Sequence, residues 1–149
     1  MKLLIVGTHP SNSNGYSKVL YNIVNHFPND YIIHWYGIQK TQCIKFRSLK
    51  SNVIVYDVHQ DEQCHNLDEN GFYYSGLQSY ITSIQPDVIL IYNDPIVCGK
   101  YIYKINTNIK VFLYLDLVYL PSRSIIDNII KPVIDCVHGV FVFNNHWTQ

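Results

Sequence analysis

The chain has 149 residues, nearly half of them hydrophobic, and its 11 lysines and arginines balance 11 aspartates and glutamates. This length suits one domain with a substantial core, whereas the zero net charge argues against a general nucleic-acid-binding protein, which needs a basic excess to displace counterions. The longest apolar runs, such as residues 88–92 and 111–115, are far shorter than the roughly 20 residues of a transmembrane helix, so no transmembrane segment is expected.

The N-terminus and the cysteines favour a cytoplasmic protein. The apolar run at residues 3–6 is too short for a signal peptide and is followed at once by Gly7 and Pro10. The four cysteines, Cys43, Cys64, Cys98 and Cys136, form no CxxC pair, so we expect reduced thiols. The chain lacks alanine and is rich in Ile, Asn, Tyr and Lys, which suggests an AT-rich genome such as that of a large DNA virus or an AT-rich microbe; the base composition of the source genome would test this.

Strand and helix patterns alternate along the chain, beginning with a strand at residues 2–6. That run is continuously apolar after Lys2, as is typical of a strand buried on both faces of a parallel sheet. Residues 16–27 place apolar side chains at helical spacing, and Pro28 ends this helix. Strands at residues 31–36 and 52–56 follow.

The next segment, residues 57–71, reads "DVHQDEQCHNLDENG" and predicts a solvated surface loop. Within it, Cys64 and His65 with His59 offer zinc-ligand chemistry. The remaining ligands would have to come from far along the chain, so the solvated loop is favoured over a zinc site.

The second half of the chain repeats the same alternation. The predicted elements are a helix at 73–84, a strand at 87–92, a helix at 95–105, a strand at 110–115, a helix at 123–135 and a strand at 139–143. Strands that alternate with helices at this spacing imply right-handed βαβ units. We therefore expect an α/β fold with a Rossmann-like, doubly wound, mostly parallel sheet in a three-layer α/β/α sandwich, formed by residues 1–149 as one domain.

The loop "GTHPSNSNGYSK" at residues 7–18 lies where open α/β sheets bind ligands, beyond the carboxyl end of a strand. Gly15 comes just before the predicted helix, and a residue without Cβ allows a ligand to approach the backbone. Free N–H groups at a helix start also favour phosphate. Ser13, Asn14 and Ser17 can either donate hydrogen bonds to a ligand or cap the helix, and the local pattern leaves both interpretations open.

Asn93 and Asp94 follow the strand at 87–92 and precede a helix that begins with Pro95. Asp94 is therefore either the N-cap of that helix or a site residue, and the pattern favours the cap at least equally.

Asp116 follows the strand at 110–115 and is flanked by two leucines, so no helix cap explains it. Its carboxylate can accept a hydrogen bond or a proton from a substrate hydroxyl, which makes it the candidate catalytic residue. His9 lies across the expected crevice and is either a second polar group of the site or a structural histidine.

Four stretches carry a family resemblance. They are "KLLIVGTHP" with "NGYSKVLYNIV", "QPDVILIYND", "KVFLYLDLVY" and "GVFVFNNHWTQ". In this order they resemble the N-terminal domain of GT-B type glycosyltransferases, in the large retaining family that includes many sucrose, glycogen and lipopolysaccharide sugar transferases (glycosyltransferase family 4-like, group 1 type). The first stretch is similar to the family's opening glycine loop and helix, although Asn14-Gly15 stands where a double glycine is common.

The resemblance implies a transferase that moves a sugar from a nucleotide-sugar donor to an acceptor hydroxyl with retention, using no cofactor and no required metal. The loop residues Ser13, Asn14, Gly15 and Tyr16 would face the donor diphosphate. Asp116 would be catalytic, and the acceptor would be bound by His9, Asn93, Asp94 and Tyr119.

The resemblance also implies a second, C-terminal domain that binds the donor nucleotide. We expect these 149 residues to be the acceptor-side half of a longer enzyme, with that domain as its partner and with little activity alone.

Two alternatives remain. The first is a stand-alone Rossmann-like or flavodoxin-like binding module without catalysis. The second is an enzyme that uses NAD or S-adenosylmethionine, which is disfavoured because G-x-G-x-x-G is absent and Tyr36-Gly37 replaces an acidic residue at the end of the second strand.

Overall fold

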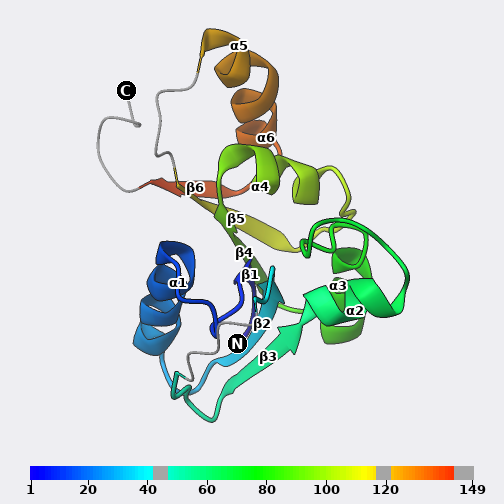
Figure 1. Ribbon diagram of the computed structural model, residues 1–149. Coiled ribbons are helices and arrows are strands. Elements are labelled where there is room, and N and C mark those ends of the chain that lie inside the picture. The colour runs from blue at the N-terminus through cyan, green and yellow to red at the C-terminus, as the bar shows by residue number, and fades with distance from the viewer. Residues whose placement is uncertain (42–46, 117–121, 143–149) are drawn as a thin grey trace.

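The computed structural model describes residues 1–41, 47–116 and 122–142, and these contain a six-stranded sheet in which every described pairing is parallel. The strands are β1 (Lys2–Thr8), β2 (Ile32–Ile38), β3 (Val53–Asp57), β4 (Val88–Asn93), β5 (Lys110–Leu115) and β6 (Gly139–Val142). Their order across the sheet is β3-β2-β1-β4-β5-β6 (Figure 1). This order and the helices on both faces confirm the predicted Rossmann-like α/β fold.

Helices cover both faces of the sheet. They are α1 (Gly15–His26), α2 (Val58–Cys64), α3 (Leu77–Ile84), α4 (Pro95–Ile102), α5 (Arg123–Ile125), the π-helical turn η1 (Ile126–Ile130) and α6 (Lys131–Asp135). Leu20 and Val24 of α1 pack against one face, whereas α2, α3, α4 and α6 pack against the other. Figure 1 shows α1 on the side of the sheet opposite α2 and α3.

The two central strands, β1 and β4, are buried on both faces. Leu4, Ile5 and Val6 have no exposed surface, and neither do Ile89 and Ile91 of β4. Burial of each such side chain contributes about 1.5–3 kcal/mol relative to exposure. A strand in this position needs apolar side chains at successive residues, which is why its sequence is continuously apolar rather than alternating.

The order in which strands are added to the sheet reverses at β1: β2 and β3 lie on one side of β1, whereas β4, β5 and β6 lie on the other. β1 leads into α1 on one face, and β4 leads into α4 on the other. In open α/β sheets, this switch point separates the two connecting loops and opens a crevice at the carboxyl ends of the strands. The start of α1 and the end of β4 therefore stand on opposite sides of the same crevice.

The first helix begins one residue earlier than its apolar pattern predicts. The Asn14 side chain accepts a hydrogen bond from the Ser17 N–H at 2.9 Å, so Asn14 is the N-cap. The helix ends at His26, with Phe27 as its C-cap and Pro28 next in the chain. The interpretation of Asn14 as a cap is thus confirmed.

The predicted surface loop at residues 57–71 is wrong in its first half, which forms α2. The Asp57 carboxylate caps this helix by accepting from the Gln60 N–H at 3.2 Å. Glu62 turns inward, is 2% exposed, and accepts hydrogen bonds from the N–H groups of Glu69 and Tyr73 at 2.8 Å and of Gly71 at 3.1 Å. An inward carboxylate breaks the apolar periodicity by which sequence patterns reveal a helix.

Two later helices also differ from expectation. The helix predicted at 73–84 begins at Leu77, because Tyr73 has a φ of 48° and cannot belong to a right-handed helix. The helix predicted at 123–135 contains η1, in which the Lys131 N–H donates to the Ile126 carbonyl five residues back. Pro132 follows directly and has no N–H to donate, which explains a local π turn.

None of the helices in the described ranges is long and apolar enough to cross a membrane.

Candidate functional site

The polar residues at the carboxyl ends of the strands fall into two clusters. The switch-point cluster consists of Tyr16, Asn93, Asp94 and Asp116, from the first turn of α1 and the ends of β4 and β5. The second group, here called the β1–β3 cluster, consists of His9, Lys40 and Asp57, at or just beyond the ends of three neighbouring strands.

Tyr16 and Asp116 approach each other across the end of β4. Burial, the negative charges of Asp116 and Asp94, and a side-chain hydrogen bond to Asp116 together raise the pKa of Tyr16 to about 12. Tyr16 therefore stays protonated and donates its hydroxyl hydrogen to the Asp116 carboxylate. The fold brings together two residues for which the family resemblance implies separate roles, one in the donor loop and one in catalysis.

The position of Asp116 is fixed by the neighbouring strand. Its backbone N–H donates to the carbonyl of Asn93 at 3.1 Å, which extends the pairing of β4 with β5 by one residue. The Asn93 side chain is mostly buried and accepts from the Asp94 N–H at 2.9 Å. Asn93 thus shapes the turn that leaves β4, while the half-buried Asp116 remains accessible to a ligand.

Asp94 is the N-cap of α4. Its Oδ1 accepts hydrogen bonds from the N–H groups of Ile96 at 2.8 Å and Val97 at 3.0 Å, and Pro95 occupies the first helical turn. This satisfies the free donors of the helix start. The cap interpretation of Asp94 is confirmed, and its charge also faces Tyr16.

The proposed diphosphate loop is exposed at Ser13, Asn14 and Gly15. A Cβ added to Gly15 would meet no atom within 4 Å, so nothing in the described chain requires glycine there. Arg47 lies beside the same helix start, where its Nη1 donates to the Ser17 hydroxyl at 2.8 Å. Its charge adds to the positive end of the α1 dipole. Arg47 was not predicted as a site residue, because it precedes β3 in an irregular segment that shows no pattern.

An aromatic series continues from the switch-point cluster along the α1 face. The ring centroids of Tyr16 and Tyr92 are 5.4 Å apart, and those of Tyr92 and Tyr114 are 5.0 Å apart. Burial, followed by the charge of Asp116, raises the pKa of both Tyr92 and Tyr114. These rings form an apolar wall below the Asp116 carboxylate.

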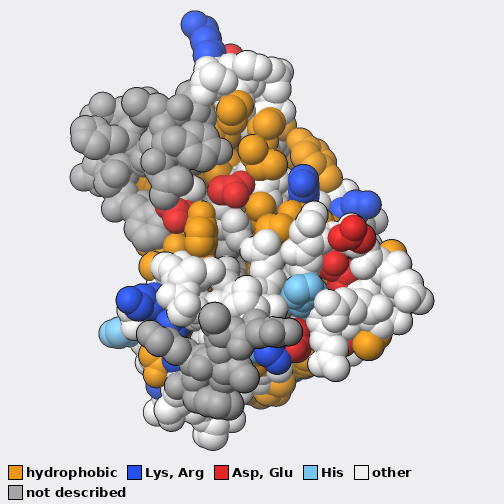
Figure 2. Space-filling model, in the orientation of Figure 1, with side chains coloured by type: hydrophobic (Ala, Val, Ile, Leu, Met, Phe, Trp, Pro, Cys, Tyr) orange, Lys and Arg blue, Asp and Glu red, His pale blue; other side chains and the backbone are white. Residues whose placement is uncertain are grey.

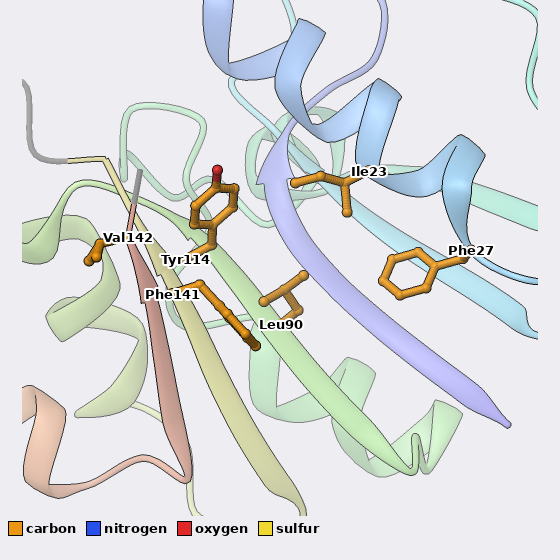
Figure 3. A pocket seen from close by; sticks show the side chains of 6 residues that line it. All are labelled: Ile23, Phe27, Leu90, Tyr114, Phe141 and Val142. Atoms are coloured by element: carbon orange, nitrogen blue, oxygen red, sulfur yellow. The ribbon is translucent and has the colours of Figure 1, made fainter. Parts of the chain in front are cut away.

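This wall leads into a groove of about 360 Å³ between α1 and strands β4 to β6 (Figure 3). Its lining residues are Ile23, Phe27, Leu90, Tyr114, Phe141 and Val142. Figure 3 shows Leu90, Tyr114 and Phe141 on the side of the sheet that faces α1. The lining residues of the groove are apolar and aromatic, and none is charged. The groove can therefore bind an apolar group of a ligand beside the switch-point cluster, but it cannot itself supply acid–base chemistry.

His9 is nine-tenths buried at the end of β1. Its backbone N–H donates to the Ile38 carbonyl at 2.9 Å, and its Nδ1 lies 3.1 Å from the Ser11 N–H and 2.7 Å from the Ser11 hydroxyl. The imidazole packs against β2 at Gly37, where an added Cβ would lie only 2.6 Å from His9 Cδ2. Glycine at this position is therefore required by the histidine ring.

Lys40 and Asp57 complete the β1–β3 cluster. Lys40 Nζ and Asp57 Oδ2 form an ion pair of 2.6 Å, and Asp57 is the register partner of Gly37. Burial would raise the pKa of Asp57, but hydrogen bonds from Lys40 and the Gln60 N–H outweigh it and hold the pKa below its usual value. Figure 2 shows histidine, basic and acidic side chains close together between α1 and α2.

The loops beyond β1 and β2 are joined by Asn12, which is almost fully buried. Its amide donates to the Gln39 carbonyl at 2.8 Å and its Oδ1 accepts from the Thr41 N–H at 3.0 Å. These two bonds fix the position of Lys40 relative to His9. Asn12 and Lys40 were not predicted as site residues, because the residues with which they pair lie in other loops of the chain.

Tyr119, proposed to bind the acceptor, lies outside the described residues, as does the end of the strand predicted at 139–143. No group of three or more His, Cys, Asp or Glu side chains in residues 1–41, 47–116 and 122–142 could hold a metal ion.

Comparison with known proteins leaves the site to be interpreted from its own geometry. No protein-family model matches the chain, and no curated protein matches it. What the described residues supply is a crevice at the switch point of a Rossmann-like sheet, with an accessible carboxylate on one side and a cation-assisted helix start on the other.

Proposed function

We propose that the chain is the acceptor-side, N-terminal domain of a retaining GT-B type glycosyltransferase, which moves a sugar from a nucleotide-sugar to an acceptor hydroxyl. The observation that carries the proposal is the convergence of Tyr16 and Asp116 over the end of β4. It supports a ligand crevice at the position where this type of sheet binds substrates.

In this proposal Asp116 is the residue that contacts the reacting groups. Its carboxylate accepts a hydrogen bond from a hydroxyl of the acceptor or of the transferred sugar, and Tyr16 holds the carboxylate in place. Because Tyr16 keeps its proton, it acts as a hydrogen-bond donor and not as a base.

The exposed loop at Ser13, Asn14 and Gly15 would approach the donor diphosphate. Support comes from the open space at Gly15 and from the positive charge of Arg47 beside the first turn of α1. A second domain in the full-length protein would bind the nucleotide, and closure of the two domains would exclude water. We place the reaction in the cytoplasm and assign it no metal.

The test is sugar transfer by the full-length protein with a panel of nucleotide-sugars and hydroxyl acceptors. Asp116→Asn should lower kcat by at least about a hundredfold, as expected for loss of a positioned acid–base or charge-stabilising group. Asp30→Asn is the matched control, because Asp30 is exposed and lies just before β2, at the edge of the sheet opposite the carboxyl ends of the strands.

Equal turnover of Asp116→Asn and Asp30→Asn would remove Asp116 from the mechanism. Binding of nucleotide-sugars without any transfer would favour the stand-alone binding module instead.

A further inference from the structure

The tautomer of His9 follows from its contacts. A backbone N–H can only donate, so the Ser11 N–H at 3.1 Å makes Nδ1 an acceptor. The Ser11 hydroxyl lies 2.7 Å from the same nitrogen. A neutral ring with an unprotonated Nδ1 carries its hydrogen on Nε2, so His9 presents one N–H donor whose direction is fixed by the protein.

The protonation state agrees with this arrangement. Burial, then the charge of Lys40, lower the pKa of His9 to about 4, and Asp57 offsets only part of this shift. The ring is therefore neutral near pH 7. Proton transfer to Nδ1 is also disfavoured, because the Ser11 N–H already points at that nitrogen.

Nε2 has no hydrogen-bond partner in the part of the chain that the structure describes. It is not sealed in the core either, since no buried side-chain nitrogen or oxygen there lacks a partner. A side chain that is nine-tenths buried thus directs one unused donor at solvent, at the edge of the sheet where ligands of such folds bind.

The neighbouring charges select the ligand class. Lys40 and Asp57 pair at 2.6 Å, so their charges largely cancel and attract neither a phosphate nor an ammonium group. Both side chains are partly exposed and retain free donor and acceptor capacity. Vicinal hydroxyl groups both donate and accept, and so match a neutral N–H, an ammonium and a carboxylate placed together.

We infer that the β1–β3 cluster is a binding site for an uncharged, hydroxyl-rich ligand, to which His9 donates a hydrogen bond through Nε2. Its identification as the part of the acceptor site that holds the acceptor sugar rests on the proposed function. The site itself rests on the geometry of His9, Gly37, Lys40 and Asp57.

The experiment uses the 149-residue chain labelled with ¹⁵N and long-range ¹H–¹⁵N spectra of the imidazole rings. Between pH 6 and pH 8, His9 should show an unprotonated Nδ1 and a protonated Nε2. A panel of methyl hexopyranosides should shift the Nε2 signal and the amide signals of Gly37 and Asp57, whereas inorganic phosphate should not. The opposite tautomer, shifts with phosphate alone, or no shift with any glycoside would overturn the inference.

Two substitutions of His9 distinguish the contribution of its N–H donor from that of its ring. His9→Gln keeps an N–H donor near the Nε2 position and should hold glycoside affinity within about threefold. His9→Phe keeps a ring but no donor and should weaken affinity about tenfold, as for loss of one hydrogen bond. His26→Phe, at an exposed position of α1, is the control and should have no effect. Wild-type affinity in a folded His9→Phe chain contradicts the role of Nε2.

Transfer assays distinguish this inference from the proposed function. Glycoside binding at His9 in a full-length protein that transfers no sugar would leave the site standing and refute the glycosyltransferase. Sugar transfer by a full-length protein in which no glycoside shifts the His9 signals would support the glycosyltransferase and refute the binding site at His9.

Discussion

Tyr16 in the first turn of α1 donates a hydrogen bond to Asp116 beyond β5, and the two residues meet across the carboxyl end of β4. The contact joins elements that are about a hundred residues apart in the chain, at the place in the sheet where its connections change face. It also couples the loop that leads to α1 with the candidate catalytic carboxylate.

Tyr16→Phe should therefore affect activity more than stability. Loss of one hydroxyl hydrogen bond costs about 1 kcal/mol of unfolding free energy, whereas a carboxylate left without its partner should lower kcat between about tenfold and a hundredfold. Tyr21→Phe on the same helix is the control, because its hydroxyl donates to the Ser48 carbonyl at 2.9 Å, away from the strand ends. Urea unfolding and transfer assays on the two variants provide the comparison, and equal turnover would show that Tyr16 does not position Asp116.

Gly37→Ala should destabilise the chain. The new Cβ would lie 2.6 Å from His9 Cδ2 and 2.8 Å from the Tyr56 carbonyl oxygen, and the backbone of β3 cannot move away without loss of pairing. Overpacking of this kind costs about 1–3 kcal/mol. Denaturant unfolding measures the change, and the ring signals of His9 should move with it.

Gly15→Ala is the matched control for Gly37→Ala, because a Cβ added at Gly15 meets no atom within 4 Å. It should leave stability unchanged or raise it by a few tenths of a kcal/mol, because alanine is the better residue in a helix. If a donor diphosphate approaches the backbone there, the same variant should raise the KM for nucleotide-sugar. An unchanged KM would remove Gly15 from the donor site.

The central strands could be predicted from sequence because burial on both faces leaves a continuous apolar run. β1 and β4 are of this kind, and their predicted bounds agree with the structure within two residues at each end. By contrast, α2 has only Val58 and Glu62 buried. A seven-residue helix with one inward apolar side chain shows no periodicity, and its inward glutamate looks like a surface residue.

The candidate site was predictable in its location but not in its pairings. Asp116 was identified because no local role explained it, whereas Asp94 could be assigned as a cap only from its two hydrogen bonds. The pairing of Tyr16 with Asp116, and of Lys40 with Asp57, depends on the strand order. Strand order is a long-range property, so residues that meet through it leave no local pattern.

Glu62→Gln should open the segment that follows α2. The carboxylate accepts three backbone hydrogen bonds, and an amide has one oxygen and no charge with which to replace them. We expect a loss of about 2–3 kcal/mol, the range for charge-assisted hydrogen bonds to a buried group.

The matched control is Glu69→Gln, whose exposed carboxylate accepts from Ser75 and should cost less than about 1 kcal/mol. Amide hydrogen exchange at Gly71 and Tyr73 should accelerate in Glu62→Gln alone. Equal exchange rates in the two variants would show that another contact holds the segment.

Acid should destabilise the fold through His9. The pKa of this histidine is about 4 in the folded chain, against 6.5 for an ordinary histidine, because burial and then Lys40 disfavour its charged form while Asp57 favours it. Between these two values the unfolded chain binds a proton that the folded chain excludes, so unfolding becomes more favourable as the pH falls. The contribution of neutral His9 is complete above about pH 6.5 and is progressively lost toward pH 4.

A fall from pH 7 to pH 5 should cost the wild type about 2 kcal/mol more than it costs His9→Gln, which has no group to titrate. Asn22→Gln is the control and should retain the wild-type dependence, since Asn22 is exposed and has no titratable group. Urea unfolding at pH 5, 6 and 7 gives the slope of unfolding free energy against pH for each of the three proteins. Subtracting the slope of His9→Gln from that of the wild type removes the contribution of the other histidines. Equal slopes for the wild type and His9→Gln would mean that the pKa of His9 does not change on folding, so that burial and Lys40 do not disfavour its charged form.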